Sequence, residues 1–183
     1  DIRQCLVGLS YTDEAMRNLF SYRFDRGSLA GHTVGNIILA ALEKITGNRE
    51  KTIALAGAML NVRGAVLPVS LIPTTLSATY TDGRKITGEH LIDEPRTRRT
   101  APITTLELTP AVRANPAALT ALEKADAIIF GPGDLYTSVL PNLLVRGVGE
   151  HIRASSAKKI IITNIMTKRG QTDGFQASDF IRV

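Results

Sequence analysis

The chain has 183 residues, of which 44% are hydrophobic, and its formal net charge is +5. This length fits one domain with a sizeable hydrophobic core, and no run approaches the roughly 20 apolar residues of a membrane span. The positive charge favours an anionic ligand but is scattered along the chain. Its one tight run, Arg96, Arg98 and Arg99, has no interleaved aromatic residue to stack a base. We interpret this run as a solvent-facing loop, with a phosphate-facing role as the alternative, and expect no nucleic-acid partner.

The single cysteine, Cys5, excludes an internal disulfide framework and fits a reducing compartment. Leu6 and Val7 follow it directly, so Cys5 is predicted to be a small core residue.

Helical periodicity dominates the first third of the chain. Thr12 is placed to cap a first helix with an acidic first turn. Apolar residues then recur at i, i+3 and i+4 over residues 34–45, and Gly47 stands where that helix should end. A third helix is expected near residues 51–60.

The period changes to two further along the chain. Residues 76–80 alternate as in a strand, and the Asp-Gly pair at 82–83 predicts a tight hairpin turn before a second strand at 85–87. A further strand is expected over residues 103–108. An Asn-Pro pair then opens a helix over residues 115–124. The hairpin is expected to lie at one edge of the main sheet.

The strongest functional signal is a glycine loop after a predicted strand. The uninterrupted apolar run at residues 127–130 is typical of a central parallel strand buried on both faces. Gly131 and Gly133 would let the backbone turn sharply and come close to a ligand, while Thr137 and Ser138 would offer donors to an anion. Tight turns between a strand and a helix also use glycine for purely structural reasons, and that interpretation stays open.

A second strand and its loop complete the expected crevice. A helix is predicted to begin near Ser138 or Leu140, and the apolar run at 160–163 follows at a distance that suits a strand, helix, strand crossover. Because ligands collect at the carboxyl edge of an open α/β sheet, residues 131–138 and 164–167 should face one crevice.

Another polar group of residues precedes the most amphipathic helix. His32 could donate to a phosphate or a ring carbonyl, and Asn36 could contact a base or a sugar. Gly35 lies between them, at a helix amino end where orphan amides attract anions. The alternative is a histidine that caps its own helix and touches no ligand. The spacing shows no metal cluster of His and Cys and no catalytic nucleophile.

Several of these motifs together resemble the gluconeogenesis factor family, the bacterial relatives of the 2-phospho-L-lactate transferases. The resemblance covers residues 1 to about 181, and it depends on Leu19 to Phe24, Gly31-His32 with Gly35-Asn36, Arg63-Gly64 with Val66 to Pro68, Asp82-Gly83, Gly88-Glu89, Gly131 to Asn142, and Asn164 to Thr172. It implies a Rossmann-like three-layer α/β/α sandwich with a mostly parallel sheet and an antiparallel edge hairpin. It also implies a cytoplasmic protein that binds a nucleotide sugar such as UDP-N-acetylglucosamine and links carbon metabolism to peptidoglycan synthesis and cell shape.

The same resemblance implies that residues 1–183 form a single domain and a fragment. In the family, an amino-terminal glycine-rich loop and carboxyl-terminal strands also build the nucleotide crevice. The candidate ligand-binding residues in this chain are His32, Gly35, Asn36, Gly131, Pro132, Gly133, Asp134, Tyr136, Thr137, Ser138, Asn142, Asn164 and Thr172.

Two departures from the family pattern concern charge. Asp134 stands where the family usually has Ser, and a carboxylate near a phosphate is repulsive unless it is turned away or bridged by a cation. The usual Thr-Gln-Pro-Gly-Glu-Thr run appears here as residues 167–172, with Lys168 and Arg169 as two added positive charges. These charges either offset Asp134 or simply face solvent.

We therefore weigh three hypotheses. The leading one is a regulatory protein that binds a nucleotide or nucleotide sugar, requires no cofactor and needs no catalytic base. The alternative is a magnesium-dependent 2-phospho-L-lactate transferase-like enzyme, with Mg²⁺ accompanying the nucleotide. The transferase branch tends to show Gly-Pro-Ser-Asn where this chain has residues 131–134 as Gly-Pro-Gly-Asp, which favours the regulator. The third hypothesis is a structural module without a ligand. Pairing into a homodimer is left open.

Overall fold

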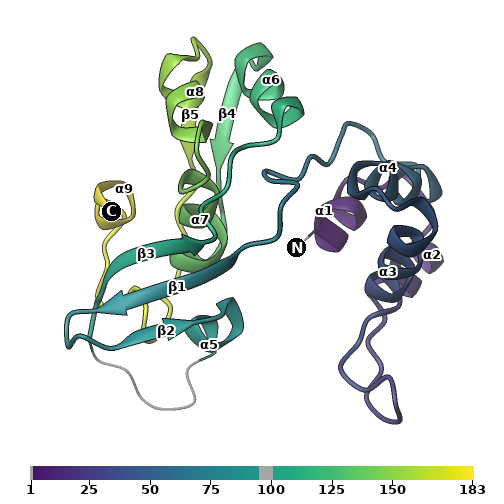
Figure 1. Cartoon of the computed structure of the whole chain (residues 1–183), viewed down its shortest axis with the longest axis horizontal. Coiled ribbons are helices and arrows are strands. Elements are labelled where there is room, and N and C mark those ends of the chain that lie inside the picture. The colour runs from purple at the N-terminus through teal and green to yellow at the C-terminus, as the bar shows by residue number, and fades with distance from the viewer. Residues whose placement is uncertain (1, 95–100) are drawn as a thin grey trace. The chain divides into compact units, whose positions relative to one another are not determined.

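Two compact units make up the chain, residues 1–68 and residues 69–183. The computed structural model describes residues 2–94 and 101–183, so the predicted arginine run at 96–99 lies outside the described residues. Each unit has its own buried side chains and is described by itself (Figure 1). The single domain expected from the sequence stays a prediction.

The first unit is built from helices. They are α1 (Ile2–Gly8), α2 (Glu14–Ser21), α3 (Val34–Thr46) and α4 (Arg49–Met59). The boundaries predicted for α3 are confirmed, since Thr33 caps its start and Gly47 ends it with a left-handed φ of 59°. The cap predicted for α2 is one residue out: Asp13, not Thr12, accepts the Met16 N–H at 2.8 Å.

The core of the first unit joins α1, α2 and α4. Its buried residues are Leu6, Phe20, Ile53, Ala56 and Leu60. The prediction that Cys5 belongs to this core is wrong, because its side chain is exposed. Leu6 already faces inward, and a helix rotates by about 100° per residue, so Cys5 points away from the core.

An antiparallel sheet opens the second unit. It consists of β1 (Thr75–Tyr80), β2 (Lys85–Thr87) and β3 (Ile103–Thr109), with β1 paired to both neighbours. The predicted hairpin is confirmed, and Gly83 in its turn has a φ of 82°. The inward residues Leu76, Ala78 and Tyr80 are buried as the alternation requires. Between β2 and β3 lies α5 (Glu89–Asp93), which the sequence pattern did not predict.

A parallel pair of strands forms a second, separate sheet. β4 (Ala127–Phe130) follows α6 (Pro116–Lys124) and pairs with β5 (Lys158–Ile161), and Ile129 stands opposite Ile160. The crossover contains the π-helical turn η1 (Leu135–Val139), α7 (Leu140–Leu143) and α8 (Val148–Ala154), and α9 (Asp179–Arg182) follows near the end. The predicted strand, helix, strand order is confirmed. β5 begins two residues before the predicted run, and the helical segment begins at Leu135 rather than near Ser138 or Leu140.

The parallel pair is not buried on both faces, contrary to expectation. Ile128 is 8% exposed, whereas its neighbour Ile129 is 59% exposed. On β5, Ile160 and Ile161 are 44% and 47% exposed. Side chains alternate between the faces of a strand, so Ile128 on one face of β4 packs inward while Ile129 on the other stays largely exposed.

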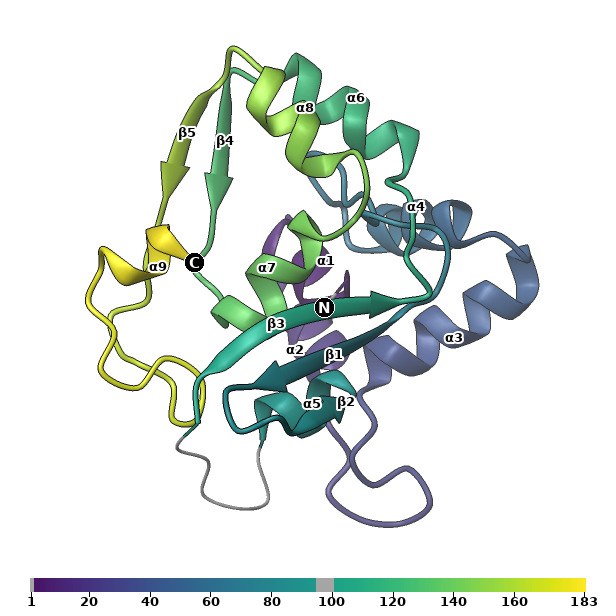
Figure 2. The same ribbon diagram turned by 60° about the vertical axis from the view of Figure 1, so that its left-hand side comes forward.

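The observed elements confirm an α/β chain. Figure 2 shows β4 and β5 side by side and running in the same direction, with α9 beyond the end of β5. Among residues 2–94 and 101–183, no helix has the length and apolarity needed to cross a bilayer.

Candidate functional site

The chain leaves β4 through a glycine that no other residue would replace without strain. Gly131 has a φ of 92°, which L-amino acids rarely adopt. A Cβ added there would collide with the backbone carbonyl oxygen of Ile162, just after β5. The Ile162 N–H donates to the Phe130 carbonyl at 2.9 Å, so the strand ladder continues to this contact. The predicted sharp turn at Gly131 is confirmed, and it places the loop in contact with the end of β5.

Gly133 has a different role from Gly131. Its φ lies outside the left-handed region, but a Cβ would sit 3.3 Å from the Cβ of Ser138. Close packing of the loop against its own helical turn, rather than backbone conformation, accounts for this glycine.

The helical turn after the loop closes on Asp134. The Asp134 carbonyl accepts the N–H groups of Ser138 at 2.7 Å and of Val139 at 3.1 Å. Asn142 braces the same turn, because its Nδ2 donates to the Ser138 carbonyl at 2.7 Å. Pro132 and the Ser138 side chain are exposed, so this side of the turn is open to a ligand.

The opposite side of the turn faces the protein interior. Tyr136 is 5% exposed and packs in the core cluster that includes Tyr80, and burial raises the pKa of Tyr136. Thr137 is 6% exposed, and its hydroxyl donates to Oδ1 of Asp93 at 2.9 Å. The Thr137 hydroxyl is thus used inside the protein, whereas Ser138 is exposed.

A lysine from the segment after β5 joins two carboxylates. Lys168 Nζ donates to Oδ2 of Asp134 at 2.6 Å and also to Oδ1 of Asp93. These residues come from three separate segments: the end of α5, the glycine loop and the segment after β5. Of the two alternatives for the added charges, Lys168 does offset Asp134, whereas Arg169 is exposed. Asp134 is therefore bridged by a cation that belongs to the chain itself.

The cluster of Lys168, Asp93 and Asp134 shifts the pKa values of two of its three members. Burial of Asp93 acts to raise its pKa, but hydrogen bonds from Lys168 and Thr137 outweigh burial and hold the pKa below its usual value. Burial of Lys168 acts to lower its pKa, but hydrogen bonds to Asp134 and Asp93 outweigh burial and raise it. Both shifts favour the charged forms, so a charged pair exists at neutral pH.

The segment that carries Lys168 is folded back on itself. The Thr172 hydroxyl accepts the Lys168 N–H at 2.7 Å, and Thr172 is 2% exposed. Gln171 is 5% exposed, and its Nε2 lies 3.3 Å from the Ile92 carbonyl and 3.4 Å from Oδ1 of Asp93. Its Oε1 is buried and has no hydrogen-bond partner. Asn164, where the segment starts, is half-buried.

The other predicted group lies in the first unit, at the start of α3. His32 and Asn36 are exposed, and Thr33 caps the helix by accepting the Asn36 N–H at 3.3 Å. The alternative that His32 caps the helix is therefore wrong. Gly35 is buried, and a Cβ there would lie 2.7 Å from the carbonyl oxygen of Phe20. Packing of α3 on α2 thus explains Gly35, and a ligand contact for it stays a prediction.

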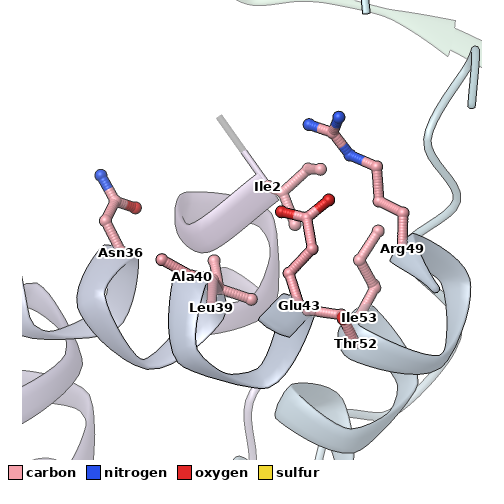
Figure 3. A pocket seen from close by; sticks show the side chains of 8 residues that line it. All are labelled: Ile2, Asn36, Leu39, Ala40, Glu43, Arg49, Thr52 and Ile53. Atoms are coloured by element: carbon pink, nitrogen blue, oxygen red, sulfur yellow. The ribbon is translucent and has the colours of Figure 1, made fainter. Parts of the chain in front are cut away.

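A pocket of about 450 Å³ also lies in the first unit and includes Asn36. Ile2, Leu39, Ala40, Thr52 and Ile53 form part of its lining (Figure 3). Glu43 of α3 and Arg49 of α4 complete it, and their charged groups point to the same side of the two helices as Asn36. Neither Glu43 nor Arg49 was among the site residues predicted from the sequence. Within the described residues, no group of three or more His, Cys, Asp and Glu side chains is placed to hold a metal ion.

Asp93 was not among the site residues predicted from the sequence, yet it accepts hydrogen bonds from Lys168, Thr137 and Gln171. Its neighbours in the sequence show only a short helix, and its partners lie 44 to 78 residues further along the chain. Lys168 carried a signal, because it departs from the family pattern and comes directly after residues 164–167, which were predicted to face the same crevice as the loop.

Comparison with known proteins assigns the family. The family model described as 2-phospho-L-lactate transferase CofD matches residues 1–183. The chain therefore belongs to the CofD family, and the resemblance to the gluconeogenesis factors within it is confirmed.

Similar relatives carry the name gluconeogenesis factor. The chain is 43% identical over 183 residues to that of Halalkalibacterium halodurans and 41% identical over 184 residues to that of Bacillus subtilis. All of the chain is covered in both matches, but it spans only 56% and 57% of the length of these relatives.

A crystal structure of a UPF0052 family member from Bacillus halodurans is similar at a TM-score of 0.92 and 43% identity. It covers 100% of this chain and 58% of that one. At this similarity the two proteins share a fold, which supports the predicted α/β class.

Proposed function

We propose that the protein binds a nucleotide sugar of the UDP-N-acetylglucosamine type at residues 131–138. In this proposal it is a cytoplasmic regulatory protein that links carbon metabolism during gluconeogenic growth to peptidoglycan synthesis and cell shape. The observation that carries the proposal is the loop after β4, which Gly131 seats on the end of β5 while Pro132 and Ser138 stay exposed. The relatives named gluconeogenesis factor support the metabolic part.

The loop suits an anionic group for two physical reasons. It lies at the carboxyl edge of a parallel strand pair, where α/β proteins collect ligands. It also leads into a helical segment at Leu135, and the partial positive charge of a helix start favours phosphate. Because Gly131 and the Asp134 carbonyl hold its shape, little ordering would be needed on binding.

The charged groups beside the loop favour binding over catalysis. A general base works best with a pKa near the operating pH. Asp93 has its pKa held below the usual carboxyl value, and its oxygen already accepts Lys168 and Thr137. Asp134 is likewise engaged by Lys168. A regulator that changes its surface on ligand binding needs no such base.

A transferase remains the second candidate, because the matching family model is that of 2-phospho-L-lactate transferase CofD. Such an enzyme would move a phosphoryl-containing group from a nucleotide donor to an alcohol by positioning, without a covalent nucleophile. That activity requires no residue beyond those that hold the donor and the acceptor in line.

Calorimetric titration of the intact protein with UDP-N-acetylglucosamine, GDP and NAD separates these candidates. We expect saturable binding of UDP-N-acetylglucosamine and no turnover of a phospholactyl-type donor. Measurable transfer would reverse the ranking, and lack of affinity for all three compounds would remove both candidates.

A variant of the loop tests whether the ligand binds there. In Gly133→Val the added methyl groups would press on Ser138, whose Cβ already lies 3.3 Å from an ideal Cβ at this position. We expect this variant to lose binding with unchanged helix content by circular dichroism. Gly83→Ala, in the distant hairpin turn, is the control and should bind normally. Normal binding by Gly133→Val would mean that the loop is only a connection.

A further inference from the structure

Lys168 occupies an unusual position for a lysine, because its ammonium lies between two carboxylates beside the glycine loop. We propose that Lys168 is a tethered cation of this site, filling the position between Asp93 and Asp134 that a divalent cation would otherwise take. Ligand binding at the loop would then need no divalent cation. The part concerning the ligand rests on the proposed function, whereas the part concerning the cation does not.

The oxygen atoms around the ammonium are those that a hard cation prefers. Asp93 and Asp134 supply carboxylates, and the Nε2 of Gln171 lies 3.4 Å from Oδ1 of Asp93. The amide oxygen of Gln171 belongs to the same planar group and is therefore close by. It is buried without a hydrogen-bond partner, in a residue that is only 5% exposed. Two carboxylates and an amide oxygen form a ligand set typical of Mg²⁺ or Mn²⁺.

The charge balance depends on Lys168. With the ammonium present, the three ionised groups Asp93, Asp134 and Lys168 carry one net negative charge. Without it, two neighbouring carboxylates would carry two, and they are only 28% and 33% exposed. Partly buried like charges attract a dication strongly, because solvent screens them incompletely. Lys168 thus both cancels one of the two negative charges and keeps a metal ion out.

Removal of the ammonium should create a metal site. In Lys168→Met, which keeps the unbranched stem of the side chain but lacks the terminal ammonium, we expect Mn²⁺ to bind at least about a hundredfold more tightly than in the unmodified protein, since the repulsion of a dication is removed. Calorimetry measures the affinity, and a rise of the melting temperature with Mn²⁺ confirms that the folded state binds it. The matched control is Lys168→Met with Asp134→Ser, which removes one carboxylate and should lose the gain.

The second arm tests the ligand. UDP-N-acetylglucosamine should bind the unmodified protein in EDTA and in Mg²⁺ with affinities that differ by less than about twofold. Binding to Lys168→Met should depend on Mg²⁺.

The results separate the two proposals. Tight Mn²⁺ binding by the unmodified protein, no gain in the variant, or a Mg²⁺ requirement of the unmodified protein would each overturn the tethered cation. No nucleotide-sugar binding under either condition would overturn the proposed function while the Mn²⁺ titrations still decide this inference. If Lys168→Met does not fold, Mn²⁺ titration of the unmodified protein and the EDTA comparison remain decisive.

Discussion

Gly131→Ala should destabilise the second unit more than Gly83→Ala, the same substitution at another glycine with a positive φ. The new side chain would meet two separate obstacles. The backbone at position 131 has a φ of 92°, in a region that costs an L-residue about 1–3 kcal/mol. Its Cβ would also collide with the carbonyl oxygen of Ile162, which is backbone and cannot rotate away.

The collision adds to the conformational strain. Ile162 also donates its N–H to the Phe130 carbonyl at 2.9 Å, so a shift of the Ile162 backbone away from the new Cβ would strain the last rung between β4 and β5. Overpacking of this kind typically costs about 1–3 kcal/mol. We therefore expect Gly131→Ala to lose about 2–6 kcal/mol of unfolding free energy, the sum of the two terms and a large share of the roughly 5–15 kcal/mol of a typical domain.

Gly83→Ala is the control for this measurement. Gly83 has a φ of 82°, but a Cβ there meets no atom within 4 Å. It should therefore lose only the conformational part, about 1–3 kcal/mol. Urea unfolding monitored by circular dichroism gives both values. Equal losses in the two variants would show that the approach of the loop to Ile162 costs nothing, and the argument that β5 holds the loop in place would fail.

Three further changes test other contacts. Gly35→Ala should cost about 1–3 kcal/mol, because its Cβ would lie 2.7 Å from a backbone oxygen of α2. Gly57→Ala, also within a helix, meets only an ordinary 3.6 Å contact and should stabilise the protein by up to about 1 kcal/mol. Urea unfolding that found Gly57→Ala less stable than Gly35→Ala would contradict the packing argument. Thr137→Val should cost about 1–2 kcal/mol in the same assay through the lost hydrogen bond to Asp93, and no loss would mean that the bond contributes nothing. The pKa of Asp93 is lowered in the folded state, so its contribution to stability is present above the unfolded value of 3.8 and is lost as pH falls through the folded value. The destabilisation by Lys168→Met, about 1–3 kcal/mol at neutral pH for this partly exposed pair, should therefore shrink in unfolding experiments at pH below about 4, and a constant difference would contradict the assigned ion pair.

Local rules predicted the elements whose causes lie within a few residues. The end of α3 at Gly47, the hairpin turn at Gly83 and the turn at Gly131 each depend on backbone conformation at one glycine. The cap at Asn115 is equally local, because its side chain accepts the Ala117 N–H at 3.0 Å. Such features are specified by neighbours in the sequence and so can be inferred from it.

Features that depend on tertiary contacts could not be predicted in the same way. The apolar run of β4 indicated burial on both faces, yet Ile129 is 59% exposed, because burial depends on what packs against a strand. The early helix start at Leu135 depends on Leu135 and Tyr136 entering the core beside β1. Asp93 gained its importance only from partners far along the chain.

The charge of the whole chain gave no guidance to the charge of the site. A net charge of +5 suggests attraction of anions, but Asp134 and Asp93 together would make the loop surroundings negative. One lysine, 34 residues after Asp134 in the sequence, compensates for this at close range. Coulomb interactions at contact distance exceed those of distant surface charges, which salt screens beyond about 10 Å. The affinity of the loop for an anion should therefore follow the occupancy of the position between the two carboxylates, and surface arginines far from it should matter little.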